Sequence, residues 1–393
     1  TKGSFLLSLF AKENNFTTVF VPSPCAKEAS SVGGLTVYSV KNLSSLINHL
    51  TGKKYIKKFN SVNEKNEKYS EQDFSEYNYI VGQEQAKRAL QICAAGGHNL
   101  IMMGPPGSGK TMIAKSIDSI IPDLSEEESI EVTKIYSLVG KIPPNFGLLK
   151  RRPFRSPHHT ISYAGMVGGG NNPVPGEITL AHRGVLFMDE FSEFSRQVIE
   201  SLRQPLESGK IVVSRSRFST EFPSRFILVA SSNPCPCGFY GDPNHQCTCT
   251  ENKIKNYRAK LSGPILDRID IHINVLPVEK KLLIKDSSTN SNETLNFVKK
   301  GISNTRLIQQ KRFKDEKIFT NSEIPNSQIE KFCSFGKGSK RLLEQAIDAY
   351  HLSARAYFKI IRVARTIADL DEKNDIEINH IAEAVQYRSK FFL

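Results

Sequence analysis

The pattern of apolar and polar positions changes along the chain and predicts an α/β protein with a helical end. Residues 98–103, 185–188 and 226–230 are almost wholly apolar. Strands covered on both faces of a parallel sheet have this composition. Toward the C-terminus, apolar residues recur every three or four positions over 340–352, 354–370 and 378–388, which predicts helices with one buried face.

The same reading divides the chain into four segments. In residues 1–59, helical spacing over 4–11 and 43–50 alternates with strand-like runs at 17–21 and 35–40, which predicts a small α/β piece. Residues 60–77 are polar and lack an apolar period, so we interpret them as a linker. A core over 78–278 follows. The last segment is 279–393. It contains a polar break over 285–296, after which the spacing of apolar residues becomes helical.

Composition restricts the class of protein. The chain has 393 residues, of which 39% are hydrophobic and 24% charged, which excludes wholesale disorder, collagen and a coiled-coil rod. No apolar run approaches the ~20 residues that span a bilayer, so we expect no membrane partner. The cysteines number seven, an odd count that favours reduced thiols and a cytoplasmic location over a disulfide scaffold.

The charge balance is basic. The formal net charge is +13, which favours an anionic partner such as nucleic acid or a membrane surface. One stretch, 132–176, contains no carboxylate at all. Its basic residues are Lys134, Lys141, Lys150, Arg151, Arg152 and Arg155, followed by His158 and His159.

The sharpest motif follows the first apolar strand. The residues are Gly104, Pro105, Pro106, Gly107, Ser108, Gly109, Lys110 and Thr111, which fit the phosphate-loop pattern GxxxxGK[ST]. Glycines let such a loop turn its backbone N–H groups toward phosphates, helped by the following helix N-terminus. We expect Lys110 to place a cation on the β- and γ-phosphates of ATP, and the Thr111 hydroxyl to bind Mg²⁺.

Two further strands end in polar side chains that suit this chemistry. The run 185–188 is followed by Asp189 and Glu190. We expect Asp189 to hold Mg²⁺ and Glu190 to orient the attacking water. Asn233 follows the run 226–230 and precedes Pro234, so it is either a turn residue or a contact to the γ-phosphate or the water.

Two arginines are candidates for charge neutralisation. Arg268 stands between Asp267 and Asp270, either in a surface ion pair or as an arginine finger that acts on a neighbouring subunit's nucleotide. Arg355 opens the predicted helix 354–370, either as a solvated residue or as a lid residue that reaches the γ-phosphate.

Four cysteines form a CxC-x9-CxC pattern: Cys235, Cys237, Cys247 and Cys249. Four soft ligands suit tetrahedral Zn²⁺, although the spacing is tighter than the common C-x2–4-C. Reduced thiols that pack a loop and a redox pair remain the alternatives.

Several runs resemble one family closely. They are 152–160 (RPFRSPHHT), 168–170, 175–178, 180–186 (LAHRGVL), 202–207 (LRQPLE), 233–238 (NPCPCG), 261–264 and 267–270. Together they resemble the magnesium-chelatase-like AAA+ ATPases of the ComM/YifB type, the competence protein M family. The likeness covers essentially the whole chain.

The resemblance implies an AAA+ P-loop core with a helical lid that works as a ring, usually a hexamer. It implies sensor 1 at Asn233, an arginine finger at Arg268 and sensor 2 at Arg355. The family is associated with DNA branch migration in natural transformation.

The DNA contacts also follow from the resemblance. Related ring helicases carry a pore hairpin, here 210–217, in which Lys210, Arg215 and Arg217 would contact phosphates; the alternative is an exposed hairpin with solubilising charges. The basic stretch 132–176 is a second candidate DNA surface.

The resemblance also covers the N-terminal piece. Residues 1–59 look like the C-terminal part of a Lon-protease-like, S5-like domain. The protease places a catalytic lysine after a glycine near this point, but here Gly3 is followed by Ser4, so we expect no proteolysis.

Two other functions remain open at this point. One is the ATPase subunit of magnesium chelatase, which drives metal insertion into a porphyrin. The other is a regulator that uses ATP as a switch and does not act on DNA.

Overall fold

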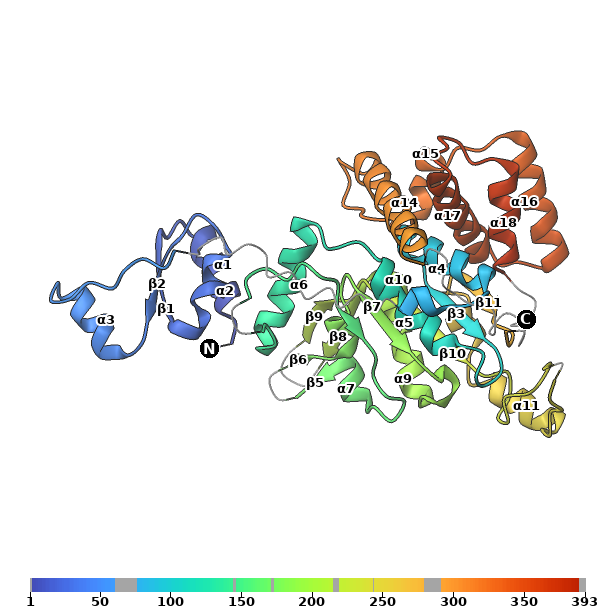
Figure 1. Cartoon of the computed structure of the whole chain (residues 1–393), viewed down its shortest axis with the longest axis horizontal. Coiled ribbons are helices and arrows are strands. Elements are labelled where there is room, and N and C mark those ends of the chain that lie inside the picture. The colour runs from blue at the N-terminus through green and yellow to red at the C-terminus, as the bar shows by residue number, and fades with distance from the viewer. Residues whose placement is uncertain are drawn as a thin grey trace. The chain divides into compact units, whose positions relative to one another are not determined.

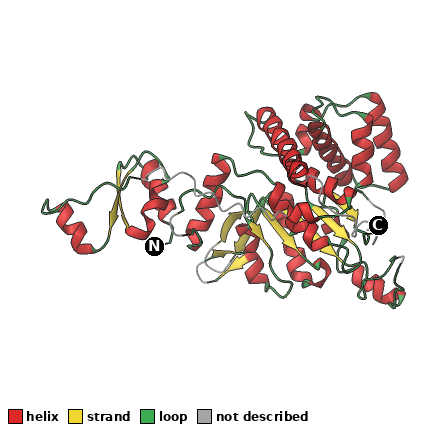
Figure 2. Cartoon of the chain, in the orientation of Figure 1, coloured by secondary structure: helices red, strands yellow, loops and turns green. Residues whose placement is uncertain are grey.

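The computed structural model describes residues 2–60, 76–143, 146–170, 173–214, 219–242, 244–278 and 291–388. They form two compact units. The smaller unit comprises Thr1–Asp73, Asp123–Arg152 and Gly170–Pro175, and the larger comprises Phe74–Pro122, Pro153–Gly169 and Gly176–Leu393. Figure 1 labels their elements, and Figure 2 shows that each unit combines helices with strands.

The smaller unit is built on a pair of parallel strands. Strand β1 (Thr18–Pro22) pairs with β2 (Thr36–Val40), with Val19 opposite Val37. Ala26, Ala29 and Val37 form its small core. The helices are α1 (Ser4–Glu13), the 3-10 turn η1 (Ser23–Cys25), α2 (Ala26–Ser30) and α3 (Leu43–Leu50). The strands and helices predicted for residues 1–59 are confirmed.

The smaller unit also includes α6 (Glu126–Val139), from within the predicted core. The Gly3 N–H donates to the Ser137 carbonyl at 2.9 Å, and the Ser137 hydroxyl donates to Glu28 at 2.5 Å. The predicted core over 78–278 is therefore interrupted, because 123–152 is grouped with the N-terminal residues.

The larger unit contains a parallel sheet with strand order β11-β3-β10-β7-β4. The strands are β3 (Leu100–Met103), β4 (Phe154–Arg155), β7 (Val185–Met188), β10 (Ile227–Ser232) and β11 (Ile271–Asn274). The three predicted strands lie side by side as β3, β10 and β7. The predicted parallel α/β core is confirmed.

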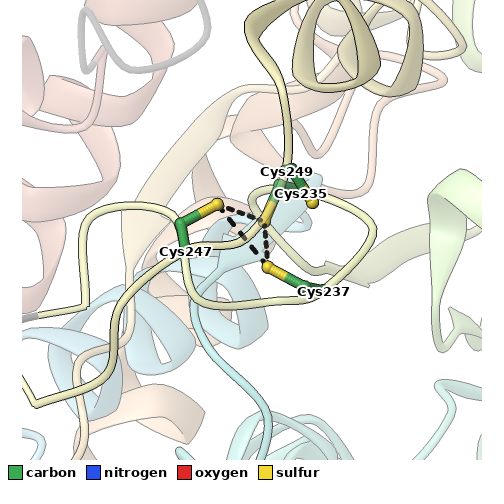
Figure 3. Close-up of side chains that lie close together, drawn as sticks. All are labelled: Cys235, Cys237, Cys247 and Cys249. Carbon is green, nitrogen blue, oxygen red and sulfur yellow. Dashed lines mark hydrogen bonds between the residues drawn. The ribbon is translucent and has the colours of Figure 1, made fainter.

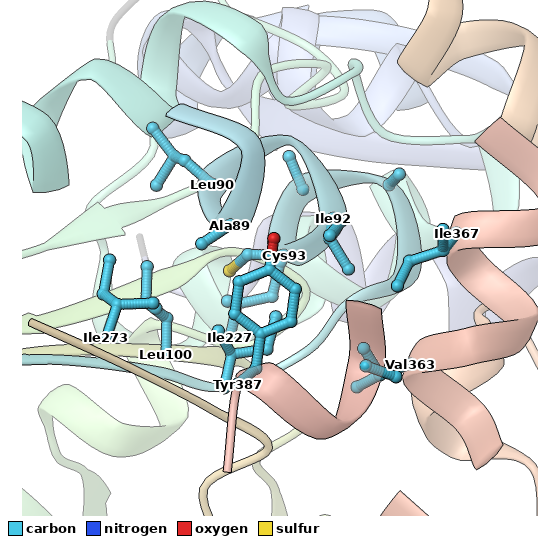
Figure 4. Packing of buried hydrophobic residues seen from close by; sticks show 14 of the residues in the cluster. Ala89, Leu90, Ile92, Cys93, Leu100, Ile227, Ile273, Val363, Ile367 and Tyr387 are labelled. Atoms are coloured by element: carbon cyan, nitrogen blue, oxygen red, sulfur yellow. The ribbon is translucent and has the colours of Figure 1, made fainter. Parts of the chain in front are cut away.

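Alternate residues of these strands enter two different cores. Leu100, Phe187 and Val229 belong to a cluster that continues into the C-terminal helices. Ile101 and Leu186 belong to a second cluster. Figure 4 shows the first cluster, where Ile92 lies near Ile367. Both faces of the sheet are thus covered, which is why its strands are apolar throughout.

Helices precede β3 or lie between the strands of the sheet along the chain. They are η2 (Glu76–Tyr79), α4 (Glu84–Gly96), α5 (Lys110–Ile120), α7 (Tyr163–Val167), α8 (Glu177–Leu180), η3 (Phe191–Glu193), α9 (Arg196–Ser201), α10 (Arg203–Ser208), α11 (Glu251–Arg258) and α12 (Gly263–Leu266). The antiparallel pair of β8 (Lys210–Ser214) and β9 (Ser219–Pro223) forms the predicted hairpin. The larger unit also contains the two-residue strand β5 (Gly168–Gly169), and β6 (Val174–Pro175) belongs to the smaller unit.

The C-terminal part of the larger unit is helical, as predicted (Figure 1). Its elements are α14 (Ser291–Arg312), η4 (Asn321–Glu323), η5 (Asn326–Gln328), α15 (Ile329–Phe332), α16 (Lys337–Tyr350), α17 (Ala354–Leu370) and α18 (Ile378–Gln386). One expectation is wrong: the polar break over 285–296 overlaps α14, which begins at Ser291. Leu295, Val298 and Ile302 bury one face of this helix, so a polar first turn does not prevent it.

Candidate functional site

The phosphate-loop sequence lies between β3 and α5, the strand and helix that its pattern predicts. Gly107 and Gly109 have φ of +76° and +88°, a region that side chains other than glycine rarely adopt. A Cβ at Gly104 would lie 2.0 Å from the Val275 carbonyl oxygen. The glycines are therefore needed for the path of the backbone and for its close packing.

Lys110 begins α5 and is almost fully buried. Its ammonium donates to the carbonyl oxygens of Gly104 and Pro105, each at 2.8 Å, and to Asn233 Oδ1 at 3.3 Å. Burial lowers the pKa of Lys110 to about 8, although the carboxylates of Asp189 and Glu190 oppose this shift. The cation is thus held inside the loop by acceptors that anionic oxygens of a ligand can replace.

A hydroxyl and a carboxylate meet beside this loop. The Thr111 hydroxyl donates to Asp189 Oδ2 at 2.9 Å. Asp189 Oδ1 accepts from the Ser231 hydroxyl and, at 3.1 Å, from the Glu190 N–H. Because β7 and β10 are paired with Met188 opposite Ala230, Asp189 and Ser231 emerge together. Thr111 and Asp189 offer hard oxygen ligands of the kind that Mg²⁺ takes, so the donor set fits the predicted ion.

Glu190 has φ of +51°, a left-handed conformation that is uncommon outside glycine. Its Oε2 lies 3.4 Å from the Nδ1 atom of His159, and its side chain is about half exposed. The ring of His159 lies against that of His158, with centroids 4.1 Å apart and an angle of 33° between the ring planes. The sequence did not predict that these two histidines belong to the site. The run SPHHT, which contains both, was the feature that could have indicated it.

Asn233 lies where β10 ends and accepts a hydrogen bond from Lys110. The structure therefore brings Lys110, Thr111, Asp189 and Asn233 together, from three neighbouring strands. The roles assigned to them, and to Glu190, stay predictions.

Arg268 and Arg355 meet at one carboxylate, Glu207. Arg355 donates to Glu207 Oε1 at 2.9 Å, Arg268 donates to Oε2, and Arg268 also donates to the Pro264 carbonyl at 2.7 Å. The hydrogen bond from Arg268 lowers the pKa of Glu207. The sequence did not predict this arrangement, in which the two candidate arginines lie side by side in one subunit.

A buried ion pair holds the backbone of Arg268 in place. Lys359 of α17 contacts the carboxylate of Asp270, and it donates to the Arg268 carbonyl at 2.9 Å. Burial by itself would raise the pKa of Asp270, but the charge of Lys359 and a hydrogen bond from the Asn99 N–H help to bring it down to about 2. Burial lowers the pKa of the adjacent His98 to about 4, so that imidazole is neutral at pH 7.

The four cysteines of the CxC-x9-CxC pattern converge on one point (Figure 3). The sulfur of Cys235 lies 3.4 Å from that of Cys237 and 3.7 Å from that of Cys247, and the last two are 3.5 Å apart. With Cys249, all four sulfur atoms lie within 4.8 Å of one another. A hydrogen bond from the Phe239 N–H lowers the pKa of Cys237 to about 5.

Of the three candidate DNA contacts in the hairpin, the structure describes Lys210. Lys210 in β8 is exposed but pairs with Glu221 of β9 at 2.7 Å. Arg215 and Arg217 lie outside the described residues. In the basic stretch, Arg152 forms a buried pair with Glu128 at 2.6 Å, and Arg155 pairs with Glu177 at 2.6 Å. Both arginines are thus engaged in ion pairs within the chain, and the DNA surface expected over 132–176 stays a prediction.

Comparison with known proteins places this geometry in a family. The magnesium chelatase subunit ChlI family model matches residues 76–283, and the ChlI C-terminal model matches residues 292–388. The chain is 39% identical over 386 residues to competence protein ComM of Haemophilus influenzae. The chain belongs to the magnesium-chelatase-like AAA+ family of the ComM and YifB type. The predicted family and fold class are therefore confirmed.

The alignments cover different shares of each relative. The ComM match covers 97% of this chain and 74% of that protein. YifB of Escherichia coli is 44% identical over 79% of this chain and 60% of its own length. The 38 kDa subunit of magnesium chelatase from Rhodobacter capsulatus is 28% identical over 40% of this chain and 50% of its own. This ComM/YifB-type chain is thus more similar to ComM and YifB than to that chelatase subunit.

Membership of this family indicates that the chain is an AAA+ ATPase that uses ATP and Mg²⁺. Within the described ranges, each helix is too short or too polar to span a lipid bilayer.

Proposed function

We propose that this chain is a ring-forming motor that hydrolyses ATP to move DNA, with branch migration in natural transformation or homologous recombination as its task in the cytoplasm. The observation that carries the ATPase part is the convergence of Lys110, Thr111, Asp189 and Asn233 around the phosphate loop. The DNA part is supported by the similarity to a protein named competence protein ComM and by the +13 net charge.

The phosphate loop binds the nucleotide in this proposal. Backbone N–H groups of Gly107, Ser108 and Gly109 and of the α5 N-terminus donate to the phosphate oxygens. Lys110 exchanges its carbonyl acceptors for the β- and γ-phosphates. Thr111 and Asp189 hold Mg²⁺, which when bound neutralises charge on the β- and γ-phosphate oxygens.

Hydrolysis needs a water in line with the γ-phosphate. Glu190, beside the metal ligand Asp189, is placed to accept a proton from that water and to orient it. Asn233 already bonds Lys110, so its amide can donate to the γ-phosphate or to the water once the nucleotide occupies the loop.

The negative charge that develops is neutralised by arginine. Arg268 acts as a finger on a neighbouring subunit's nucleotide, which requires an oligomer, and a hexamer is the proposed ring. Because Arg268 and Arg355 share Glu207, we assign both to the same nucleotide, that of the neighbour. In this assignment, Arg355 of the lid acts on the neighbour's nucleotide and not on that of its own subunit.

DNA binding is proposed for the hairpin that contains β8 and β9. Lys210 begins β8, and the predicted contacts Arg215 and Arg217 follow β8 in the sequence, outside the described residues. Contacts of this type read the phosphate backbone, so binding should be independent of base sequence and sensitive to salt. A structural zinc ion on the four cysteines completes the proposed set of ligands.

The test measures ATP hydrolysis by the purified chain with and without single-stranded DNA. Several-fold stimulation that vanishes at high salt supports the motor, and a labelled branched DNA then tests branch migration. Glu190→Gln should abolish hydrolysis. Glu193→Gln, the same change three residues later, should not.

Other outcomes would favour the alternatives. Hydrolysis that DNA does not change would overturn the DNA motor. Stimulation by a porphyrin-binding partner would then indicate a chelatase-like ATPase, in line with the weaker similarity to the Rhodobacter subunit. Slow turnover that neither addition changes would indicate a switch.

A further inference from the structure

We propose that the four cysteines bind one zinc ion, and that this ion holds the segment 233–250 against the phosphate loop and so tightens nucleotide binding. The inference rests on the proposed ATP site. It adds that the metal centre and the nucleotide site are mechanically coupled.

The sulfur positions fit the ion. A tetrahedral zinc–thiolate site with bonds of ~2.3 Å has sulfur–sulfur edges of ~3.8 Å. The observed edges among Cys235, Cys237 and Cys247 are 3.4–3.7 Å. A disulfide requires ~2.05 Å, and all four cysteines are free. The cluster therefore has the size of a metal site and not of a disulfide pair.

The segment needs such a cross-link because it has little core of its own. Cys235 is fully buried, but from Phe239 to Thr250 every residue that the structure describes is at least partly exposed. The ring contacts of Phe239 with His245 and of Tyr240 with Arg258 are only partly shielded from water, so packing gives this loop little stability. In other small folds a bound metal supplies this stability instead.

One end of the segment contacts the phosphate loop directly. Gly238, which follows Cys237, has φ of +86°, and a Cβ there would lie 2.5 Å from Cδ of Pro106. The backbone of the metal loop therefore lies directly against the phosphate loop. Cys235 is also only two residues from Asn233, which bonds Lys110. A shift of the cysteines would move both contacts.

The other end returns to the same place. Thr250, next to Cys249, caps α11, accepting from the Lys253 N–H at 3.4 Å. At the end of α11, Arg258 donates to the Pro234 carbonyl at 3.4 Å. The segment and α11 together, 233–258, thus form a loop that returns to Pro234, the residue after Asn233, and the four cysteines lie within it.

The first experiment compares the wild-type chain with Cys247→Ser and Cys249→Ser. Zinc content is measured by elemental analysis, and nucleotide affinity by anisotropy of a fluorescent ADP analogue. We expect one zinc per wild-type chain and loss of zinc from both variants. Their Kd for nucleotide should rise about tenfold or more, with the circular dichroism spectrum unchanged.

A second pair of variants keeps all four thiols. Gly238→Ala should retain zinc but weaken nucleotide binding, because its Cβ collides with Pro106. Gly241→Ala is the matched control: Gly241 has a similar φ of +79°, but nothing lies within 4 Å of its Cβ position. It should leave both zinc content and Kd near the wild-type values.

Each contrary result overturns a defined part. A wild-type chain without zinc, even after growth with added zinc, rules out the metal site. Zinc loss with unchanged Kd, or equal effects of the two glycine variants, rules out the coupling. If the zinc-loaded wild-type chain does not bind nucleotide at all, the proposed ATP site is wrong. The measured zinc content would still support the metal site.

Discussion

At the residue scale, the candidate site is a set of side chains whose hydrogen-bond partners can be replaced by a phosphate group or by Mg²⁺. Lys110 is held by two carbonyl oxygens and Asn233, and Thr111 by Asp189. None of these contacts requires a nucleotide, yet each pairs a group with the kind of atom that a phosphate or Mg²⁺ would offer it. The site is therefore arranged before binding, which reduces the cost of ordering it.

The buried position of Lys110 predicts how nucleotide binding depends on pH. Before a nucleotide binds, the pKa of Lys110 is about 8. Above that pH the amine is increasingly neutral, so binding an anion requires uptake of a proton. The apparent Kd should be flat below about pH 7 and rise up to about tenfold per unit above about pH 8. A fluorescent ADP analogue measures this.

The control for that profile is Lys110→Met. It should bind nucleotide weakly, and its Kd should lack the rise at alkaline pH. An unchanged wild-type Kd between pH 7 and pH 9.5 would contradict the expectation.

His159 yields a second prediction at this scale. Its Nδ1 atom is 3.4 Å from the carboxylate that we assign to the attacking water. Removing it should leave the Glu190 side chain without that neighbour, so His159→Ala should lower kcat about tenfold while the nucleotide Kd stays constant. His158→Ala is the control. A change in Kd with kcat preserved would show that His159 contributes to binding instead.

At the element scale, the lid and the sheet are joined by a buried ion pair. Lys359 comes from α17, and Asp270 immediately precedes β11. The pair also fixes the backbone carbonyl of Arg268. Thus one contact connects the position of the lid helix to that of the proposed finger.

This pair predicts the stability of the larger unit. Lys359→Met leaves a buried carboxylate without its cation, which should lower the free energy of unfolding by about 3–5 kcal/mol. Lys359→Met with Asp270→Asn should recover much of the loss. Urea unfolding measures both. A single variant as stable as the wild type would show that the pair contributes nothing.

The Lys359–Asp270 pair also predicts how the stability of the larger unit changes at acidic pH. The pKa of Asp270 is about 2, below its ordinary 3.8. The folded form therefore releases this proton more readily than the unfolded chain. The stabilisation is present above about pH 4 and is lost as the pH falls toward about 2. In Lys359→Met this step should shrink.

The elements themselves were largely predictable. Apolar runs and flanking polar residues located β3, β7 and β10, because runs this short that end in polar residues favour strands buried on both faces over helices. The phosphate loop and the four-cysteine cluster were found because their residues are close in sequence.

What could not be predicted is long-range pairing. Glu207, Arg268 and Arg355 are separated by 61 and 87 positions, and no periodicity relates them. His159 approaches Glu190 from a loop whose path depends on packing. Helix α6 lies within the predicted core segment, yet it contacts Gly3 and Glu28 of the N-terminal segment, and no local pattern relates these residues.

At the scale of the whole molecule, the proposed ring makes each nucleotide site depend on two subunits. A site works when its own Glu190 and its neighbour's arginines are intact. This arrangement has a consequence that single variants do not show. Mixing two inactive variants should restore hydrolysis when their defects lie on opposite sides of an interface.

Glu190→Gln and Arg268→Ala are such a pair. Each alone should be inactive, but in rings mixed in equal amounts roughly a quarter of the interfaces combine an intact Glu190 with an intact Arg268. ATP hydrolysis should therefore reappear after mixing. Its continued absence, with mixed rings confirmed by labelled subunits, would contradict action between subunits.

A third variant then tests the arrangement at Glu207. If Arg268 and Arg355 act on the same neighbouring nucleotide, Arg355→Ala should also be rescued by Glu190→Gln, but mixing Arg355→Ala with Arg268→Ala should restore nothing. In that mixture every site receives an incomplete pair of arginines. If Arg355 instead acts within its own subunit, that same mixture contains complete sites and recovers hydrolysis. The shared carboxylate favours the first result, because one side chain places both guanidinium groups on one surface of the subunit.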